Sequence, residues 1–194
     1  MDTFNEEDIK RFGFLIEDDD ALAERLRAKH VKPKSISHDS LDPEAATLAA
    51  VFEYFIGNLD FSLTDNHGDE SCCHNVKLML LEDGRHLPVP YDFDMSGMVD
   101  APYAMPPVAL TKAYDLRSVR NRLYRGFCSP PELLTKTLSK FRERREEIYA
   151  LVHTQELLKE KERRYLRRFI EDFYKDIEGE RSIERNFVDR MRGC

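Results

Sequence analysis

The sequence predicts an α+β domain that is mostly helical and carries one small β-hairpin. Two short apolar runs, residues 76–81 and 85–91, are separated by an Asp-Gly pair, which is a strong signal for a hairpin turn. From residue 114 onward, apolar side chains recur at spacings of three and four between charged residues, as in amphipathic helices. A further helical pattern, residues 43–56, precedes the hairpin. Helices therefore dominate the expected fold.

Length and charge exclude several classes of protein. The chain has 194 residues, which suits a single domain, 1–194, with one hydrophobic core. Its 37 acidic and 30 basic residues give a net charge of -7, whereas nucleic-acid-binding domains are usually basic, so we expect no nucleic-acid partner. No apolar run approaches the roughly 18 residues that a membrane span needs, and the N-terminus lacks the apolar stretch of a signal peptide. We therefore expect a soluble chain.

The first part of the chain combines a strand, a helix and a loop. Residues 12–16 are apolar and predict a short buried strand. The acidic run that follows suits the start of a helix within residues 17–30, because acidic side chains interact favourably with the N-terminal end of the helix dipole. Residues 31–42 are polar and contain a proline, which predicts a loop.

The next helix has clear boundaries. Asp42 is its expected N-cap, and Pro43 occupies the first helical position, where proline is favoured. Apolar side chains recur at helical spacing as far as Ile56, and Gly57 suits a C-terminal cap. The polar residues 57–75 predict a loop between this helix and the hairpin.

The turn of the hairpin predicts its register. If Asp83-Gly84 is a two-residue loop, Leu78 faces Val89 and the other apolar residues of both strands pair in step. These apolar side chains then share one face of the hairpin, which can pack against helices.

The same register brings two polar residues together at the open end of the hairpin. Asn75 faces Asp92 in a pair without cross-strand hydrogen bonds, where side chains lie close. Pro88 and Pro90 fall in the same class of pair, so they need no donor and stiffen the strand that leads to Asp92. An amide oxygen and a carboxylate suit Mg²⁺ or Mn²⁺. Alternatively, Asn75 and Asp92 merely cap the hairpin, or Asp92 begins a turn.

The rest of the chain is expected to be helical. The charged residues of the last three helices are expected to form solvated faces. The predicted helices span residues 114–125, 130–153, 155–176 and 180–192. The first of them carries four arginines, which either pair with local acids on a solvated face or contact an anion or substrate. They are Arg117, Arg120, Arg122 and Arg125.

The four cysteines, Cys72, Cys73, Cys128 and Cys194, are too few for a disulfide scaffold. In a reducing cytoplasm they remain free thiols. In an exported protein we expect Cys72 or Cys73 to pair with Cys128 or Cys194, because adjacent cysteines do not easily bridge each other. A metal site formed by the adjacent cysteines with His67 and His74 is a further alternative, although its spacing matches no usual zinc motif.

The order of helix, polar loop, hairpin and Asp-Phe segment resembles the C-terminal lobe of protein kinases. "IGNLD", residues 56–60, resembles the Gly-Asn-x-Asp catalytic loop of HipA-like kinases. "VPYDFDMSG", residues 89–97, resembles the Pro-Trp-Asp-x-Asp segment of the bacterial spore-coat CotH-like kinases, and residues 12–26 resemble their hinge strand and following helix. The resemblance covers residues 11–105 and leaves 106–194 as a helical subdomain.

This resemblance implies metal-dependent phosphoryl transfer from ATP to an acceptor hydroxyl, on a protein, a sugar or a small molecule. Asp60 would orient the hydroxyl, Asn75 and Asp92 would hold Mg²⁺ or Mn²⁺, and Asp94 would be an outer ligand. Lys77 occupies the cofactor-binding position where kinases often place an apolar residue under the adenine ring, and a lysine there departs from ordinary adenine binding. CotH-like proteins are often exported, which favours export over a cytoplasmic location.

The sequence also departs from the kinase pattern. Asp60 and Asn75 lie fifteen residues apart, whereas the usual spacing is five, and Asn66 is a rival ligand. No glycine-rich loop and no strand-borne lysine precede residue 12, so the phosphate-covering N-lobe is absent and is expected from a longer form of the protein or from another chain. The alternative function is non-catalytic: a kinase-derived module, or a truncated fragment, that binds a partner.

Overall fold

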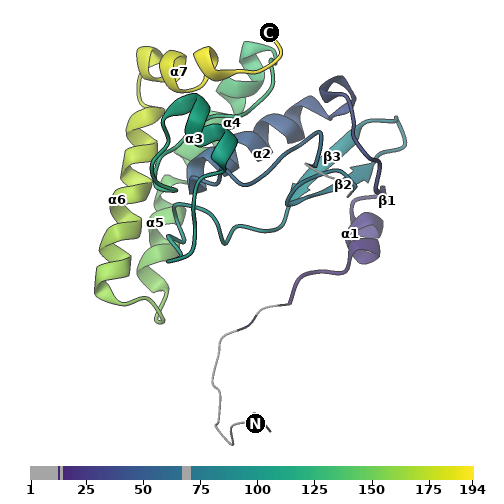
Figure 1. Ribbon diagram of the computed structural model, residues 1–194. Helices are drawn as coiled ribbons and strands as arrows, with labels where there is room; N and C mark the ends of the chain where they lie inside the picture. The colour runs from purple at the N-terminus through teal and green to yellow at the C-terminus, as the bar shows by residue number, and fades with distance from the viewer. Residues whose placement is uncertain (1–12, 14, 67–70) are drawn as a thin grey trace, which may run out of the picture.

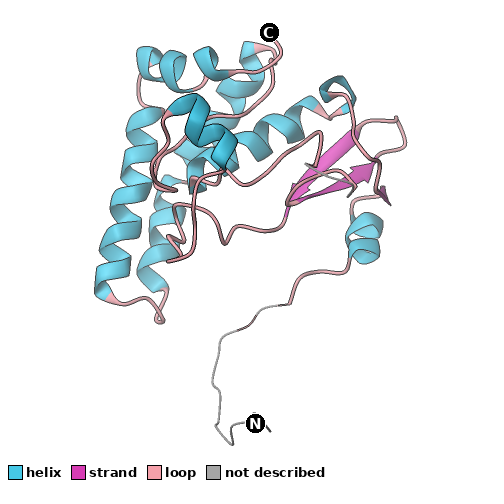
Figure 2. Cartoon of the chain, in the orientation of Figure 1, coloured by secondary structure: helices cyan, strands magenta, loops and turns pink. Residues whose placement is uncertain are grey.

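The computed structural model describes residue 13, residues 15–66 and residues 71–194. This part of the chain forms an α+β fold with seven α-helices and one three-stranded antiparallel sheet, as the sequence predicted in outline (Figure 2). Helix α2, Pro43–Ile56, runs through the middle of the molecule. The sheet lies at one end of α2, and the helices of the C-terminal half gather at the other (Figure 1).

The first described residues differ from the predicted buried strand. Leu15 and Ile16 expose 101% and 61% of their surface and belong to no strand, because nothing in the described chain packs on them. Phe12 and Phe14 lie outside the described residues. Helix α1, Asp19–Arg25, forms as predicted, and its N-cap is Asp18, whose carboxylate accepts hydrogen bonds from two backbone amides of the first turn.

The predicted loop over residues 31–42 contains two short elements. Strand β1, Lys29–Val31, overlaps its start, and a 3₁₀ turn occupies His38–Ser40. Helix α2 then begins as predicted: the Asp42 carboxylate accepts a hydrogen bond from the Ala45 amide at 2.8 Å. It ends at Gly57, whose φ of 67° is in the left-handed region that favours glycine.

The sheet has the order β1-β2-β3, with β2, Val76–Leu80, in the centre and β3, His86–Pro90, at the edge. The hairpin forms, but the predicted register is wrong by one residue. Leu78 pairs with Pro88 rather than with Val89. Because side chains alternate between the faces of a strand, this shift puts Pro88 on the face that packs on α2 and turns Val89 to the other.

The shift has its origin in the turn. The Leu81 amide donates to the Arg85 carbonyl at 2.9 Å, so three residues form the loop, and Gly84 has a φ of 86°. An Asp-Gly pair suits this three-residue loop as well as the two-residue one. Pro88 and Pro90 still fall in pairs that need no cross-strand donor, and they lie on the edge strand, where a missing amide is tolerated.

Five helices follow the hairpin: α3, Val108–Tyr114; α4, Pro131–Glu143; α5, Arg145–Thr154; α6, Glu160–Asp176; and α7, Glu180–Asn186. The predicted helix over 130–153 is thus two helices that meet at Arg144. The predicted helix over 114–125 is wrong, because α3 ends at Asp115 with a φ of 50° and the chain beyond it is irregular. Among the described residues, no helix is both long and apolar enough to cross a membrane.

The main core lies between α2, α4 and α6. Its centre is aromatic and includes Tyr54, Phe55, Phe141, Phe173 and Phe187. Charged side chains of α4 and α6 lie on their outer faces, as predicted from the amphipathic pattern. A second cluster fills the space between α2 and the sheet.

The segment after β3 is joined to the end of α2 by two glycines. The Gly97 amide donates to the Gly57 carbonyl at 3.0 Å, and the Met98 amide donates to the Ile56 carbonyl at 2.9 Å. A Cβ atom on Gly97 would collide with the Val119 carbonyl, so only glycine fits this contact. The predicted Asp-Phe segment is therefore fixed against the loop that begins at Gly57.

Candidate active site

Asn58 links the loop after α2 to the segment after β3. Its side chain exposes 1% of its surface. The Asn58 Oδ1 atom accepts a hydrogen bond from the Asp60 amide at 3.0 Å, and the Nδ2 atom donates to the Asp92 carbonyl at 3.4 Å. Two of the predicted site residues are therefore tied to one buried amide.

The Asp60 carboxylate is held by the last two residues of the same loop. His74 Nε2 lies 3.0 Å from Asp60 Oδ1. Asn75 Nδ2 donates to Asp60 Oδ2 at 3.1 Å and to the Asp60 carbonyl at 2.7 Å. The side chain of Asp60 remains 29% exposed, so its carboxylate is oriented by these contacts and still open to solvent.

Asn75 and Asp92 do not face each other across the hairpin, contrary to the prediction. Asn75 stands opposite Tyr91, whose amide donates to the Asn75 carbonyl at 3.2 Å. Asn75 has a φ of 57°, a conformation that asparagine tolerates better than most residues. Asp92 follows one residue later, beyond the end of the ladder, because the three-residue turn shifts the register.

Asp92 begins a turn, which was the alternative interpretation of its position. Its Oδ1 atom accepts a hydrogen bond from the Asp94 amide at 3.4 Å. Asp94 in turn accepts one from the Tyr103 hydroxyl at 3.1 Å, and this contact raises the pKa of Tyr103. Asp94 is exposed, and its partner Tyr103 lies nine residues later in the chain.

The predicted metal ligands of this region, Asn75 and Asp92, would bind a metal ion through oxygen atoms. No group of three or more His, Cys, Asp or Glu side chains suited to a metal occurs among the residues that the structure describes. The amide of Asn75 directs its nitrogen at Asp60, which turns its oxygen away from Asp60. Asn75 and Asp92 therefore offer an amide oxygen and a carboxylate, which are ligand types that Mg²⁺ accepts together with water and phosphate oxygens.

A pocket of about 290 Å³ opens beside Asp60. Its polar lining includes Asp60, His74 and Arg125, and α3 covers it with Val108 and Leu110. The Arg125 guanidinium donates to the carbonyls of the residues on either side of Asp60, Leu59 at 2.8 Å and Phe61 at 2.6 Å. Burial lowers the pKa of Arg125 to about 10.

A second pocket, of about 390 Å³, lies between β1, β2 and the loop that carries the Cys72–Cys73 disulfide. It contains Lys77, the predicted cofactor-binding residue, together with His30 and Lys32. The Lys77 ammonium lies 3.2 Å from an Asp19 carboxylate oxygen and 4.7 Å from the centre of the Tyr91 ring. The pocket therefore contains two lysines, one of them paired with an acid, and an aromatic side chain.

The disulfides differ from the predicted pairing. Cys72 is bonded to Cys73, and Cys128 is bonded to Cys194. The second pair forms because the chain around Cys128 runs beside the C-terminus, where the Cys128 amide donates to the Arg192 carbonyl at 2.8 Å. Since no described cysteine is a free thiol, neither the free-thiol alternative nor a thiolate metal site with His74 applies; His67 lies outside the described residues.

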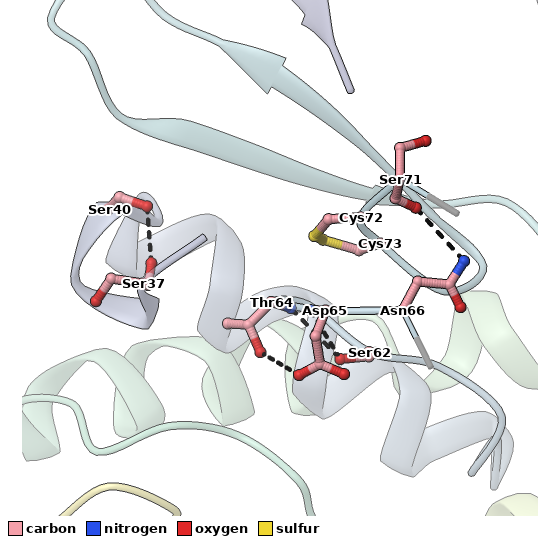
Figure 3. Close-up of a disulfide and its surroundings, with 9 residues drawn as sticks. All are labelled: Ser37, Ser40, Ser62, Thr64, Asp65, Asn66, Ser71, Cys72 and Cys73. Atoms are coloured by element: carbon pink, nitrogen blue, oxygen red, sulfur yellow. Dashed lines mark hydrogen bonds between the residues drawn. A yellow bond between two sulfur atoms is a disulfide. The ribbon is translucent and has the colours of Figure 1, made fainter. Parts of the chain in front are cut away.

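The Cys72–Cys73 disulfide belongs to the same loop as Asp60, and Figure 3 shows it together with Ser62, Thr64 and Asp65 of that loop. Both cysteines are buried against Phe61 and Leu63 of that loop. Asn66, the rival ligand, donates its side-chain Nδ2 to the Ser71 carbonyl at 3.4 Å. The insertion between Asp60 and Asn75 thus folds back on the sheet, and both of its described ends meet at the site.

The four predicted arginines divide into two pairs. Arg117 and Arg120 are exposed and pair with Asp115 and Asp100, as the solvated-face alternative predicted. Arg122 is mostly buried and donates to three backbone carbonyls, those of Tyr54 and Phe55 at the end of α2 and that of Phe169 in α6. Arg125 binds the Asp60 loop as described above, so the buried pair bonds to backbone rather than to local acids.

Sequence reasoning missed Asn58 as a site residue, and it gave Arg125 two roles, a solvated face or an anion contact, but not a contact with the Asp60 loop. Asn58 was part of the quoted "IGNLD" motif, and its position two residues before Asp60 was the available signal. The contact of Arg125 with the Asp60 loop had no local signal, because its partners are backbone carbonyls more than sixty residues away in sequence. No family model, curated protein or solved structure matches this chain.

Proposed function

We propose that this chain is the C-terminal lobe of a kinase-like phosphotransferase, which transfers a phosphoryl group from a nucleoside triphosphate to a hydroxyl. The observation that carries the proposal is the network around Asn58. It joins Asp60 to the Asp92 backbone, while Asn75 holds the Asp60 carboxylate. Three residues that a phosphotransferase would need are connected at the open end of one hairpin.

Asp60 would orient the acceptor hydroxyl. His74 and Asn75 fix the carboxylate but leave it partly exposed at the 290 Å³ pocket. Each carboxylate oxygen has two lone pairs, so a hydroxyl in the pocket can still donate to Asp60. Catalysis of this kind depends mainly on position and on electrostatic stabilisation, which suits a side chain held from two sides.

Asn75 and Asp92 would hold Mg²⁺ or Mn²⁺, which would neutralise charge on the phosphates when bound. The nucleotide would lie over the pocket that contains Lys77 and Tyr91. Because Lys77 is paired with Asp19, its charge is already partly compensated, and the aromatic ring of Tyr91 offers a stacking surface for a base. A phosphate-covering lobe would come from a longer form of the protein or from another chain.

Calorimetric titration with a non-hydrolysable ATP analogue and Mn²⁺ tests the proposal in the longest natural form of the protein. Asp92→Ala removes a charged ligand and should abolish metal-dependent binding. Asp60→Ala should leave binding nearly intact and remove phosphoryl transfer, because Asp60 contacts the acceptor. Asp115→Asn, which changes an exposed acid paired with Arg117, is the matched control and should behave as wild type.

Asn75 and Asp92 should also depend on each other. If both bind one metal ion, the double alanine variant loses little more affinity than Asp92→Ala alone, because the metal is lost only once. Wild-type protein that shows no metal-dependent nucleotide binding, or Asp92→Ala that binds as wild type does, would contradict the proposal. The chain would then be better described as a non-catalytic module that binds a partner.

A further inference from the structure

Glu53 is a fully buried acid that none of the contacts described so far uses. It lies in the last turns of α2 and exposes 0% of its surface. Within the part of the chain that the structure describes, neither carboxyl oxygen has a hydrogen-bond partner of normal geometry, although the Asn58 side chain lies close enough to lower the pKa of Glu53. A buried carboxyl without full hydrogen bonding destabilises a fold, so its presence needs an explanation.

The surroundings of Glu53 belong to the site. Burial is the largest effect on Glu53 and raises its pKa to about 8; Asn58 and Arg125 lower the pKa, and Asp60 raises it. Farther from Glu53, the charge of Arg192 lowers the pKa of Arg125, and the charge of Asp65 raises it. The Asn58 amide also donates to the Glu53 carbonyl at 2.8 Å, so Glu53 lies at the base of the loop that carries Asp60, close to Asn58.

We propose that Glu53 is a positioning residue that acts through Asn58 and Arg125 on the loop of Asp60. In its protonated form it is neutral and leaves Asn58 bonded to the Asp92 carbonyl and Arg125 bonded to Leu59 and Phe61. In its ionised form it attracts both donors and weakens these contacts. The effect of Glu53 on activity rests on the proposed function. The contacts of Asn58 and Arg125 with the loop do not depend on that function.

The contact most sensitive to Glu53 is the one from Asn58 to Asp92. At 3.4 Å it is longer than a typical N–H···O bond, so a nearby carboxylate can compete for the same amide group. Arg125 makes shorter bonds, and ionised Glu53 would compete with them through its charge. We therefore expect the Asp60 loop to be ordered and the site to be active at a pH below the pKa of Glu53. At a higher pH we expect the loop contacts to weaken.

The test compares wild type with Glu53→Gln, which keeps the shape but cannot ionise. The side-chain N–H signals of Asn58 and Arg125, followed by NMR, should shift in wild type with a midpoint near pH 8 and remain flat in Glu53→Gln. Phosphoryl transfer should fall at least tenfold in wild type between pH 7 and 9 and should not fall in Glu53→Gln. Glu53→Leu, which also lacks the charge, is the second variant and should likewise lack the alkaline step.

The two readouts separate the inference from the proposed function. A shift of both NMR signals without any transfer activity would support the positioning role and contradict the phosphotransferase. An alkaline loss of activity that persists in either Glu53 variant would contradict the positioning role alone. If neither variant folds, the ¹³C signal of the Glu53 carboxyl in wild type decides: a midpoint that differs from that of Asn58 and Arg125 overturns the inference.

Discussion

Asn75 donates one side-chain nitrogen to both the carboxylate and the carbonyl of Asp60, at 3.1 and 2.7 Å. The pair closes the loop between α2 and β2, because Asn75 leads directly into β2 while Asp60 lies four residues after Ile56, the last residue of α2. The insertion that separated these residues from the usual kinase spacing therefore does not separate them in space.

The first prediction concerns the stability of this closure. Asn75→Gly keeps the left-handed backbone and removes two hydrogen bonds, so we expect a loss of roughly 2 kcal/mol in the free energy of unfolding. Asn75→Ala should cost about 1 kcal/mol more, because an alanine is strained at a φ of 57°. Urea denaturation measures both. Equal stability of wild type and Asn75→Gly would show that the Asp60 contacts do not form.

A second prediction concerns Arg125. Arg125→Met leaves the Leu59 and Phe61 carbonyls without their donor, and each buried unpaired group costs about 1–3 kcal/mol. We expect a loss of roughly 2–4 kcal/mol in thermal or chemical denaturation. Arg117→Met is the matched control: its arginine is exposed and pairs only with Asp115, so it should change stability by less than about 0.5 kcal/mol. Similar losses in both variants would contradict the assigned role.

The two disulfides should differ in their effect on stability. Cys128–Cys194 closes a loop of 66 residues, and the chain-entropy argument gives roughly 4 kcal/mol as the contribution of a bridge of this length. We expect Cys194→Ala to lower the free energy of unfolding by roughly 2–4 kcal/mol. Cys72–Cys73 closes no comparable loop, so Cys72→Ser with Cys73→Ser should lack this entropic loss.

Mass spectrometry of unreduced peptides checks the pairing itself. Peptides that join Cys72 or Cys73 to Cys128 or Cys194 would contradict both bonds at once. The measurement also tests the path of the C-terminus, since Cys194 reaches Cys128 only when Arg192 lies beside Phe127.

Elements with local signals could be predicted from the sequence, and the hairpin register could not. Helix α2 has an Asp N-cap, a first-turn proline and a terminal glycine, all within the element itself. The register depends on which strand face is apolar, but this sheet has buried residues on both faces: Leu78 lies against α2, and Met79 lies on the opposite face. The apolar pattern therefore fits two registers, and the Asp-Gly turn fits both loop lengths.

The candidate site likewise contains residues that the sequence predicted and one, Glu53, that it did not. Asp60, Asn75 and Asp92 follow from short motifs, whereas Glu53 is hidden in a helix whose apolar pattern pointed to other faces. Leu48, part of the predicted apolar stripe, is 40% exposed, while Glu53 is fully buried. The helix is surrounded by the sheet, the C-terminal helices and the loop of Arg125, so no single stripe defines its buried side.

The last prediction uses the pH dependence of stability at Glu53. The pKa of Glu53 is raised in the folded protein, from 4.5 to about 8, so the folded state holds a proton that the unfolded state releases between these values. Relative to Glu53→Gln, wild type should therefore lose stability as the pH rises from about 4.5 to 8 and should lose no more above 8. Each pKa unit corresponds to about 1.4 kcal/mol, so a rise from 4.5 to about 8 makes the total loss on the order of 5 kcal/mol.

Denaturation of both proteins in urea at several pH values between 4 and 9 measures this difference. Asp115→Asn serves as the control, because its carboxylate is exposed and should add no comparable slope. A difference between wild type and Glu53→Gln that stays constant across this range would mean that Glu53 is ionised in the folded protein. In that case an ionised Glu53 would have to be compensated by Arg125 at neutral pH, and the neutral form could not be the one that leaves the Asp60 loop in order.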